Sequence, residues 1–411
     1  MEYICNYGKE FLSLEIPEEN IIKFNYRQNN HSEKAEEEII SQAILNPIAA
    51  KPLHKAANKK KEACVLVSDI TRPCPSYKFL PYLIKELEKA EVEKIKIVFG
   101  LGIHRKHTRD EQIRLAGNYA AEKCVLIDSD QNRCISVGTT SRGTPVEVFE
   151  EVLDSDFLIA TGNIEYHYFA GYSGGSKALM PGVCSYSSVA ANHSMMLDEM
   201  AGAGQYYDNP VRQDIEEVGK IVNIDYIYNV ILDDHKKIIG AVAGKNNEAF
   251  IEGMKIYDSF YEITSSEKAD IVITACGGYP KDINLYQAQK ALDNVKDIIK
   301  DKGTIIMIAE CPEGFGEDKF AEWMHNASDF EYLYKKIKEK FVLGGHKAVA
   351  VSKLLTKAKV LLYSSFDTAT TNQMGFGKIN SIQDYINSRL SEDKDLRFAV
   401  VPNGRFIRLS R

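Results

Sequence analysis

The chain has 411 residues, 44% of them hydrophobic, and carries a formal net charge of −7. This length favours two or three domains with ordinary buried cores. The acidic balance argues against nucleic acid as a partner, because binding to a phosphate backbone normally requires a basic surface.

Membrane association is not expected from the apolar runs of this chain. The longest runs, such as Thr304–Ala309, fall far short of the roughly 20 residues that span a bilayer. The N-terminus lacks the basic and then apolar pattern of a signal peptide, so we expect a cytoplasmic location. The eight cysteines are scattered without a CxxC pair, which indicates reduced and mostly buried thiols.

Short apolar runs rich in β-branched residues recur in the first half of the chain. They predict strands at 63–68, 94–99, 123–128 and 156–161. Between the first two, Tyr77–Ala90 places its apolar residues at helical spacing, and Ser76 is suited to cap that helix. Strand, helix and strand in succession are typical of a parallel sheet.

The same alternation restarts after the polar segment 263–269. It predicts strands at 270–276, 304–310, 359–363 and 398–401, and helices at 286–300 and 329–339. We therefore expect an α/β protein made of two α/β domains with mainly parallel sheets. The expected division is an N-terminal cofactor-binding and catalytic domain at 1–267, which the segment 385–411 could complete, and a C-terminal α/β domain at 268–384.

Polar motifs follow the predicted strands. They are Ser68–Arg72, Gly100–Arg105, Thr161–His167, Cys276–Lys281 and Cys311–Gly316. In open α/β sheets, ligands bind beyond the carboxyl ends of the strands. One cleft between the two domains would collect all of these motifs, so we expect the active site there.

The stretch from Gly162 to Gly182 brings a histidine, a glycine-rich turn and Lys177 close together in sequence. Such a turn can direct backbone N–H groups at an anion, and a lysine adds a positive charge and a potential nucleophile. The run fails the P-loop pattern, because Ser176 and Ala178 stand where glycine and a hydroxyl residue are required. The GxGxxG pattern that begins at Gly100 fails at Arg105. The plainer alternative is a flexible turn with a surface lysine.

Three histidines, His104, His167 and His193, lie beside glycines or small polar residues. Imidazole can act as a general base or bind nickel, copper or zinc, although a lone histidine is more often structural. Three imidazoles with an open water position would also suit a zinc-dependent hydrolase. We expect His107 and His346 at the surface or capping helices.

Asp69 and Arg72 flank a predicted turn. Arg72 offers a fork of donors for a carboxylate or phosphate, and its plainer role is a surface ion pair. Asp69 could merely stabilise the turn. In the second half of the chain, Tyr286, Gln287 and Lys290 form a polar set, in which the last two share one predicted helical face.

Taken in order, these motifs resemble the nickel-dependent lactate racemase family. The resemblance rests on Ser68–Pro73, Gly102–Arg105, the block from His167 through Lys177 to His193, and Asp282–Gln287 with Lys290. It covers most of the chain, and its most specific part is the spacing of His167, Lys177 and His193.

The resemblance implies a nickel-pincer nucleotide, a pyridinium-3,5-bisthiocarboxylic acid mononucleotide that holds nickel. Lys177 would attach to it covalently, His193 would complete the nickel coordination, and Asp69 with Gly174, Gly175 and Ser176 would also bind the cofactor. Cofactor-maturation enzymes would be partners.

The resemblance further implies that His104 and His167 are the catalytic bases, one for each enantiomer of a 2-hydroxy acid. Arg72, Tyr286, Gln287 and Lys290 would bind this small-molecule substrate. The reaction would be racemisation or epimerisation of lactate or a related acid by hydride transfer through a 2-keto acid. A non-enzymatic nucleotide or metal carrier remains a further alternative.

Overall fold

A computed structural model describes residues 1–26, 34–72, 74–102, 104–233, 235–342, 344–404 and 406–409. Two motif residues quoted above, Pro73 and Ile103, lie outside these ranges. The chain divides into two compact units, of which unit 1 comprises residues 1–27 with 262–411 and unit 2 comprises residues 28–261. Both are α/β units, as expected, and most of the cysteines are buried.

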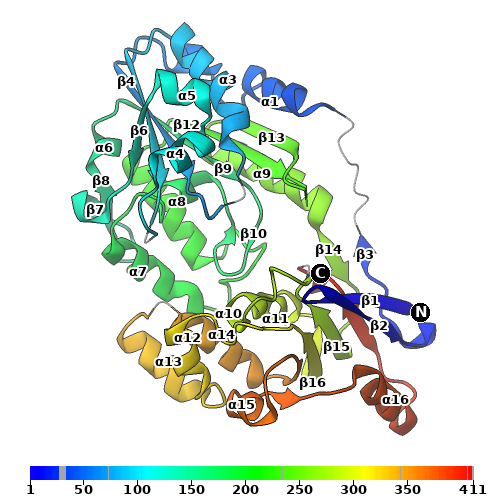
Figure 1. Ribbon diagram of the computed structural model, residues 1–411. Coiled ribbons are helices and arrows are strands. Elements are labelled where there is room, and N and C mark those ends of the chain that lie inside the picture. The colour runs from blue at the N-terminus through cyan, green and yellow to red at the C-terminus, as the bar shows by residue number, and fades with distance from the viewer. Residues whose placement is uncertain are drawn as a thin grey trace. The chain divides into compact units, whose positions relative to one another are not determined.

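The main sheet of unit 2 contains all four strands predicted in the first half of the chain. Within the described residues its order is β13-β12-β9-β4-β5-β6, and every neighbouring pair is parallel except β12 with β13 (Figure 1). The strand bounds are β4 Glu62–Ser68, β5 Lys94–Gly100, β6 Val125–Asp128, β9 Phe157–Asn163, β12 Tyr226–Leu232 and β13 Ile238–Gly244. The central strands are nearly continuous apolar runs because both of their faces are buried.

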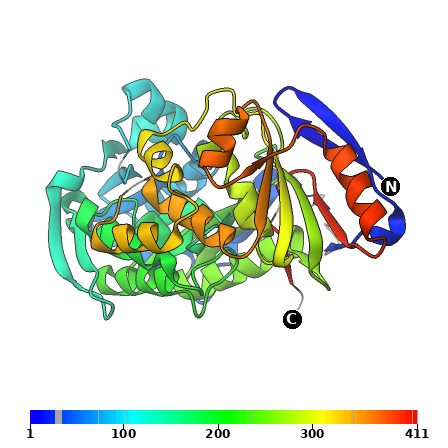
Figure 2. The ribbon, with the colours of Figure 1, turned by 90° about the horizontal axis from the view of Figure 1, so that it is seen from below.

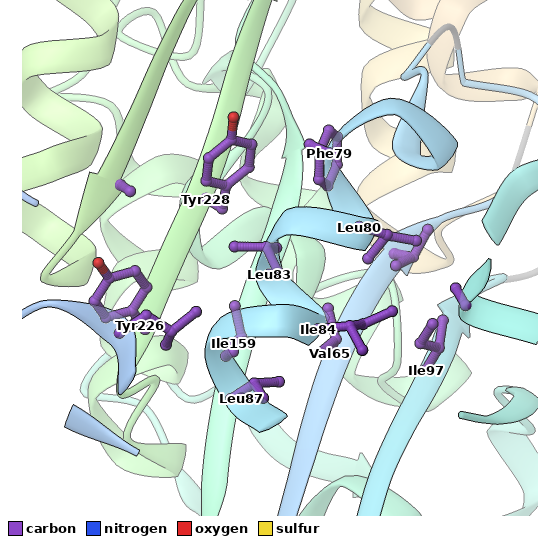
Figure 3. Packing of buried hydrophobic residues seen from close by; sticks show 14 of the residues in the cluster. Val65, Phe79, Leu80, Leu83, Ile84, Leu87, Ile97, Ile159, Tyr226 and Tyr228 are labelled. Atoms are coloured by element: carbon purple, nitrogen blue, oxygen red, sulfur yellow. The ribbon is translucent and has the colours of Figure 1, made fainter. Parts of the chain in front are cut away.

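Helix α3, Ser76–Lys89, covers one face of this sheet. Its buried residues Phe79, Leu83 and Leu87 recur at helical spacing and pack against strand residues such as Val65 and Tyr228 (Figure 3). The expected capping role of Ser76 is wrong: Ser76 is already the first helical residue, and its hydroxyl points to the Cys74 sulfur, 3.7 Å away.

Other elements of unit 2 complete the layer structure. The helices are α1 Glu36–Leu45, α2 Leu53–Ala56, α4 Arg109–Ala116, α5 Asn118–Lys123, α6 Glu150–Leu153, α7 Tyr186–Ser194, α8 Pro210–Val222 and α9 Asn246–Tyr261. The strands β7 Cys134–Thr139 and β8 Pro145–Phe149 form an antiparallel hairpin. The run predicted as a strand at 123–128 starts later, because α5 extends to Lys123.

Unit 1 has a fully parallel sheet in the order β18-β17-β16-β15-β19 within the described residues. It contains the strands predicted in the second half of the chain, at β15 Ala269–Ala275, β16 Ile299–Ile308, β17 Lys359–Tyr363 and β19 Phe398–Val401. The small strand β18 Gly377–Lys378 lies at one edge. Its longer helices are α12 Asp318–Met324, α13 Phe330–Glu339, α14 Gly345–Leu355, α15 Thr368–Gln373 and α16 Ile382–Glu392. The helix predicted at 329–339 is α13, and Asp329 caps it by accepting from the Tyr332 N–H.

The single helix predicted at 286–300 is wrong. The segment forms two short helices, α10 Leu285–Ala288 and α11 Lys290–Val295, and strand β16 then begins at Ile299. The apolar residues Leu285, Leu292 and Val295 are buried, and we attribute the break in the helix to their packing against the sheet. The charged positions between them had suggested one continuous helix at the surface.

The division of the chain differs from the expected one at both ends. The hairpin of β1 Glu2–Tyr7 and β2 Glu10–Glu15 belongs to unit 1 rather than to the N-terminal domain, and α16 remains in unit 1 as well. Figure 2 shows this hairpin (blue) beside α16 (red), where Gln383 pairs with the Glu15 backbone at 2.9 and 3.0 Å. Cys5 and Leu14 share a buried core with Ile386 and Phe398. Apolar burial therefore attaches residues 1–27 to the C-terminal half of the chain.

Candidate active site

The turn after β4 is tied to His104, which follows β5. Asp69 is 4% exposed, and its carboxylate lies 2.6 Å from His104 Nδ1 and accepts the Thr71 hydroxyl at 2.8 Å. Strands β4 and β5 are paired in parallel with Ser68 opposite Gly100, so their following loops meet at one sheet edge. A carboxylate can only accept, so Nδ1 of His104 carries the proton and Nε2 carries the lone pair of a general base.

The charge state of Asp69 follows from these partners. Burial raises the pKa of the carboxyl, but hydrogen bonds from His104 and Thr71 and the positive charges of His104 and Arg72 lower it more. The net pKa lies below the ordinary value, so Asp69 is ionised at neutral pH. The Arg72 side chain itself is exposed.

His167 lies on a short hairpin formed by β10 Tyr166–His167 and β11 Gly171–Tyr172. The hydroxyl groups of Tyr166 and Tyr172 both donate to Asp258 of α9, at 2.8 and 2.9 Å. Gly171 has φ +76, and a Cβ there would lie 1.9 Å from the Gln205 carbonyl oxygen, so only glycine fits.

The protonation pattern of His167 is the reverse of that of His104. The Ala170 N–H donates to His167 Nδ1 at 3.2 Å. A backbone N–H cannot accept, so Nδ1 carries the lone pair and the neutral ring carries its proton on Nε2. In the neutral rings, Nε2 of His104 therefore presents a lone pair and Nε2 of His167 presents an N–H that can donate a hydrogen bond.

The glycine turn next to Lys177 uses its polar groups within the protein. The Gly175 N–H donates to Asn229 Oδ1 at 2.9 Å, and the Gly174 carbonyl accepts from Arg212 at 3.2 and 3.3 Å. The Ser176 hydroxyl donates to Glu216 at 2.7 Å and accepts from Asn246 at 2.8 Å. The Gly175 N–H and the Ser176 hydroxyl thus already have buried partners within the chain.

The buried ion pair of Arg212 and Glu216 packs against the glycine turn. Arg212 of α8 is fully buried, lies 2.5 Å from Glu216 and stacks over Phe250 at 4.0 Å. A Cβ on Gly175 would lie 2.8 Å from Phe250 and 2.9 Å from Arg212. Close packing accounts for the glycine at this position.

Lys177, which follows the glycine turn, is unusual because its side chain is buried. It is 8% exposed, and within the described part of the chain its Nζ has no hydrogen-bond acceptor or carboxylate partner. Burial, followed by the positive charges of Arg72 and Arg212, holds the pKa of Lys177 well below its ordinary value, against the opposing charge of Glu165. A lowered pKa increases the fraction of the amine that is unprotonated and therefore able to act as a nucleophile.

His193 lies near the C-terminal end of α7. Its Nδ1 lies 3.2 Å from the Asn192 Oδ1, and the Asn192 amide nitrogen donates to Asp214 at 2.8 Å. This orientation of the amide makes Oδ1 an acceptor, so Nδ1 carries the proton and Nε2 the lone pair that a metal would need. Phe169 contacts both His193 and His167, with ring centroids 4.9 and 4.6 Å apart.

The remaining predicted residues, Tyr286, Gln287 and Lys290, belong to unit 1. Lys290 Nζ donates to Gln287 Oε1 at 2.8 Å, although the two residues belong to different short helices and not to the single helical face that was predicted. Lys347 of α14 was missed. It donates to the Tyr286 carbonyl at 2.9 Å and lies 3.4 Å from the centre of the Tyr286 ring.

Lys347 is buried, and burial followed by the charge of Lys290 lowers its pKa to about 7. A sequence signal for it exists: Gly344, Gly345 and His346 precede Lys347 much as glycines precede Lys177.

Two further histidines differ from expectation. His107 and His346 are buried rather than at the surface, with 1% of the His107 side chain and 3% of His346 exposed. Burial and then the charge of Lys347 lower the pKa of His346 to about 4. Both rings accept a backbone N–H, from Ile70 and Gly344 respectively, which a sequence pattern does not reveal.

In the described residues no group of three His, Cys, Asp or Glu side chains is arranged to hold a metal ion. The alternative of a zinc site made of His104, His167 and His193 therefore finds no support. Nor does any helix in the described ranges have the length and apolar character needed to cross a membrane.

Two α/β units, one of which carries a histidine oriented by a carboxylate and a buried lysine of lowered pKa, are typical of an α/β enzyme. Family models for the lactate racemase N-terminal domain and the lactate racemase C-terminal domain match residues 7–204 and 264–407. The chain belongs to the lactate racemase family and is an isomerase of the racemase type.

Known proteins support this assignment. The lactate racemase of Thermoanaerobacterium thermosaccharolyticum is 34% identical over 343 residues, or 80% of this chain and 79% of that protein. The lactate racemase of Lactiplantibacillus plantarum is 31% identical over 333 residues, or 79% and 78%. The solved apoprotein structure of the Thermoanaerobacterium enzyme matches all of both chains with a TM-score of 0.89 and 30% identity. A Thermotoga maritima protein shares the fold, with a TM-score of 0.62 and 16% identity over 92% of this chain and 98% of that one.

Proposed function

We propose that this enzyme interconverts the enantiomers of lactate or a closely related 2-hydroxy acid with the help of a nickel-pincer nucleotide. The observation that carries the proposal is Lys177, a buried lysine of lowered pKa held on a rigid turn. An ordinary structural lysine would be ion-paired or solvated. An amine of lowered pKa in this position suits covalent attachment to an electrophilic cofactor.

The side chains present fit such a cofactor. Lys177 supplies the nucleophilic amine, and His193 supplies an imidazole whose Nδ1 is engaged by Asn192, so that Nε2 carries the lone pair for nickel. When bound, the cofactor would supply reversible acceptance of a hydride from the α-carbon, by way of a 2-keto acid. The buried turn at Gly174–Ser176 would orient Lys177 rather than bind the cofactor itself.

His104 and His167 would perform the proton transfers. The lone pair on His104 Nε2 can take the hydroxyl proton of one enantiomer. For the opposite enantiomer, His167 would return a proton from its imidazolium form, which requires that Nδ1 is also protonated and its contact with the Ala170 N–H is opened, and would be left as a neutral ring. Asp69 stabilises His104 when it becomes charged.

Cationic side chains would bind the substrate carboxylate. Arg72 in unit 2 is exposed and close enough for its charge to act on both Asp69 and Lys177. In unit 1 we propose Tyr286, Gln287 and Lys290 as substrate-binding residues, with Lys347 beneath Tyr286. The precise hydroxy acid would depend on the size and charge of the side chains that contact it.

The test uses protein produced together with cofactor-maturation enzymes. Metal analysis is expected to find nickel, intact-mass measurement a nucleotide adduct lost in K177A, and chiral chromatography the conversion of each lactate enantiomer to a mixture. Bound nickel and adduct with no conversion of any enantiopure 2-hydroxy acid would indicate a carrier. Zinc alone restoring a hydrolytic activity would contradict the racemase proposal.

A further inference from the structure

His107 occupies a central place beneath the proposed acid–base site. Its side chain is buried, and both ring nitrogens are engaged. Nδ1 lies 2.8 Å from the Asp128 carboxylate, and Nε2 accepts the Ile70 N–H at 3.2 Å. The edge of the ring also contacts Phe99, with centroids 5.4 Å apart.

The partners determine the form of the ring. Asp128 can only accept, so Nδ1 carries the proton, and the Ile70 N–H can only donate, so Nε2 carries the lone pair. Asp128 is itself held, since it accepts the His107 N–H at 2.6 Å and the Gln112 amide at 3.1 Å. The imidazole is therefore fixed in position, orientation and tautomer.

These contacts join the ends of three adjacent strands. Asp128 ends β6, His107 belongs to the loop after β5, and Ile70 belongs to the turn after β4, in a sheet where β4, β5 and β6 are neighbours. Ile70 lies within the turn closed by the Arg72 N–H donating to the Asp69 carbonyl at 3.1 Å. The same turn carries the Asp69 carboxylate that contacts His104.

We propose that His107 is a positioning residue that holds the Asp69–Arg72 turn in the conformation in which Asp69 orients His104. The effect on catalysis rests on the function proposed above. The effect on the His104 ring does not, because it follows from contacts within the chain. His104 and His107, both in the loop after β5, thus contact the Asp69–Arg72 turn. His104 contacts the Asp69 side chain, and His107 contacts the Ile70 backbone.

Two substitutions of His107 distinguish a positioning role from a role in core packing alone. His107→Asn keeps a donor near the position of Nδ1 for Asp128 but is too short to reach Ile70. His107→Gln extends an acceptor toward the position of Nε2. The matched control pair is His54→Asn and His54→Gln, because His54 Nδ1 also pairs with a carboxylate in unit 2, that of Glu86 at 2.7 Å.

Two measurements apply to each variant. In the full-length apoprotein, ring ¹⁵N chemical shifts report whether His104 keeps its proton on Nδ1. In the cofactor-loaded enzyme, kcat and KM for lactate are measured. H107N is expected to lose the single His104 tautomer and to lower kcat roughly 10- to 100-fold, as misplacement of a catalytic group does, with a much smaller change in KM. H107Q is expected to restore most of both, and the His54 variants to match the wild type.

The outcomes distinguish the two proposals. If H107N retains the His104 tautomer and equals H107Q in kcat, the positioning role is overturned. Should the wild type bind cofactor yet racemise nothing, the function is overturned, and the ¹⁵N measurement still decides the role of His107. An equal loss in H107N and H107Q, with His104 unchanged, would show that His107 serves only to fill the core.

Discussion

The Asp69 carboxylate lies 2.6 Å from His104 Nδ1, and the two residues come from loops after neighbouring parallel strands. Asp69 is almost fully buried, whereas the His104 side chain is 48% exposed. The pair thus joins a fixed, ionised carboxylate to an imidazole that can meet a substrate. Orientation of a base by a buried carboxylate is a recurrent arrangement in acid–base catalysis.

Asp69→Asn is expected to lower kcat by roughly 100-fold or more, because an amide can donate to Nδ1 and stabilise the wrong tautomer of His104. The variant should fold, since the amide can still accept the Thr71 hydroxyl. The measurement is kcat on cofactor-loaded enzyme with each lactate enantiomer. Asp130→Asn is a suitable control, because that carboxylate pairs with Lys106 at the exposed surface. A kcat for D69N within a few-fold of the wild type would contradict the assigned role.

His104→Ala and His167→Ala are each expected to abolish steady racemisation, because a two-base reaction needs one proton acceptor and one donor. In the substrate-free wild type, ring ¹⁵N shifts should show the proton on Nδ1 of His104 and on Nε2 of His167, in accord with their partners. His235→Ala, at an exposed position, is the control. Undiminished turnover in either active-site variant, or identical tautomers in the wild type, would refute the base pair.

Lys177 should react with a small electrophile such as cyanate at a rate that rises less steeply between pH 7 and pH 9 than the rate of an ordinary lysine. Its lowered pKa leaves a larger fraction of the amine unprotonated, whereas the reaction of an ordinary lysine accelerates about tenfold per pH unit below its pKa near 10.4. Peptide mass spectrometry of the apoprotein, with exposed Lys220 as the internal comparison, gives both rates. An equally steep rise at Lys177 and Lys220 would show that Lys177 is charged at neutral pH.

Lys347 should make the free energy of unfolding rise with pH. Its pKa is about 7 in the folded chain and near its ordinary value of 10.5 when unfolded, so the unfolded chain binds more protons between these values. Stability relative to Lys347→Met is therefore lowest below pH 7 and increases above it, by up to about 1.4 kcal/mol per pH unit. Urea unfolding of both proteins at pH 6.5, 7.5 and 8.5 measures this difference.

Lys338→Met provides the control for that experiment. Lys338 also lies against a tyrosine ring, 4.6 Å from Tyr334, but it is exposed. Its substitution should change stability by an amount that does not vary with pH. A constant difference between the wild type and K347M would mean that Lys347 is charged in the folded chain.

Much of the architecture was predictable from local patterns. The runs at β4, β5, β9 and β15 are apolar on both faces, which is typical of central parallel strands, and α3 shows its buried stripe directly. The break between α10 and α11 was not predictable, since it results from burial of Leu292 and Val295 against a sheet formed by distant segments.

Of the candidate site, too, one part was predictable from the sequence and another was not. The motifs around Asp69, His104, His167, Lys177 and His193 were recognisable in sequence because their residue types are unusual together. The expectation of His107 at the surface was wrong, and the internal hydrogen bonds of Gly175 and Ser176 were not predictable, because the partners Asp128, Asn229 and Glu216 are between 21 and 54 residues away. Sequence spacing does not show which donors are already paired.

The sequence by itself determined the α/β class, the alternation of strands and helices and the residues able to carry acid–base or nucleophilic chemistry, because these follow from local hydrophobic period and side-chain type. Only the tertiary structure decided that residues 1–27 join the C-terminal unit, that Lys177 is buried next to positive charge, and which ring nitrogen of each histidine carries the proton. Burial, pKa and tautomer all depend on neighbours that the fold brings together from distant parts of the chain.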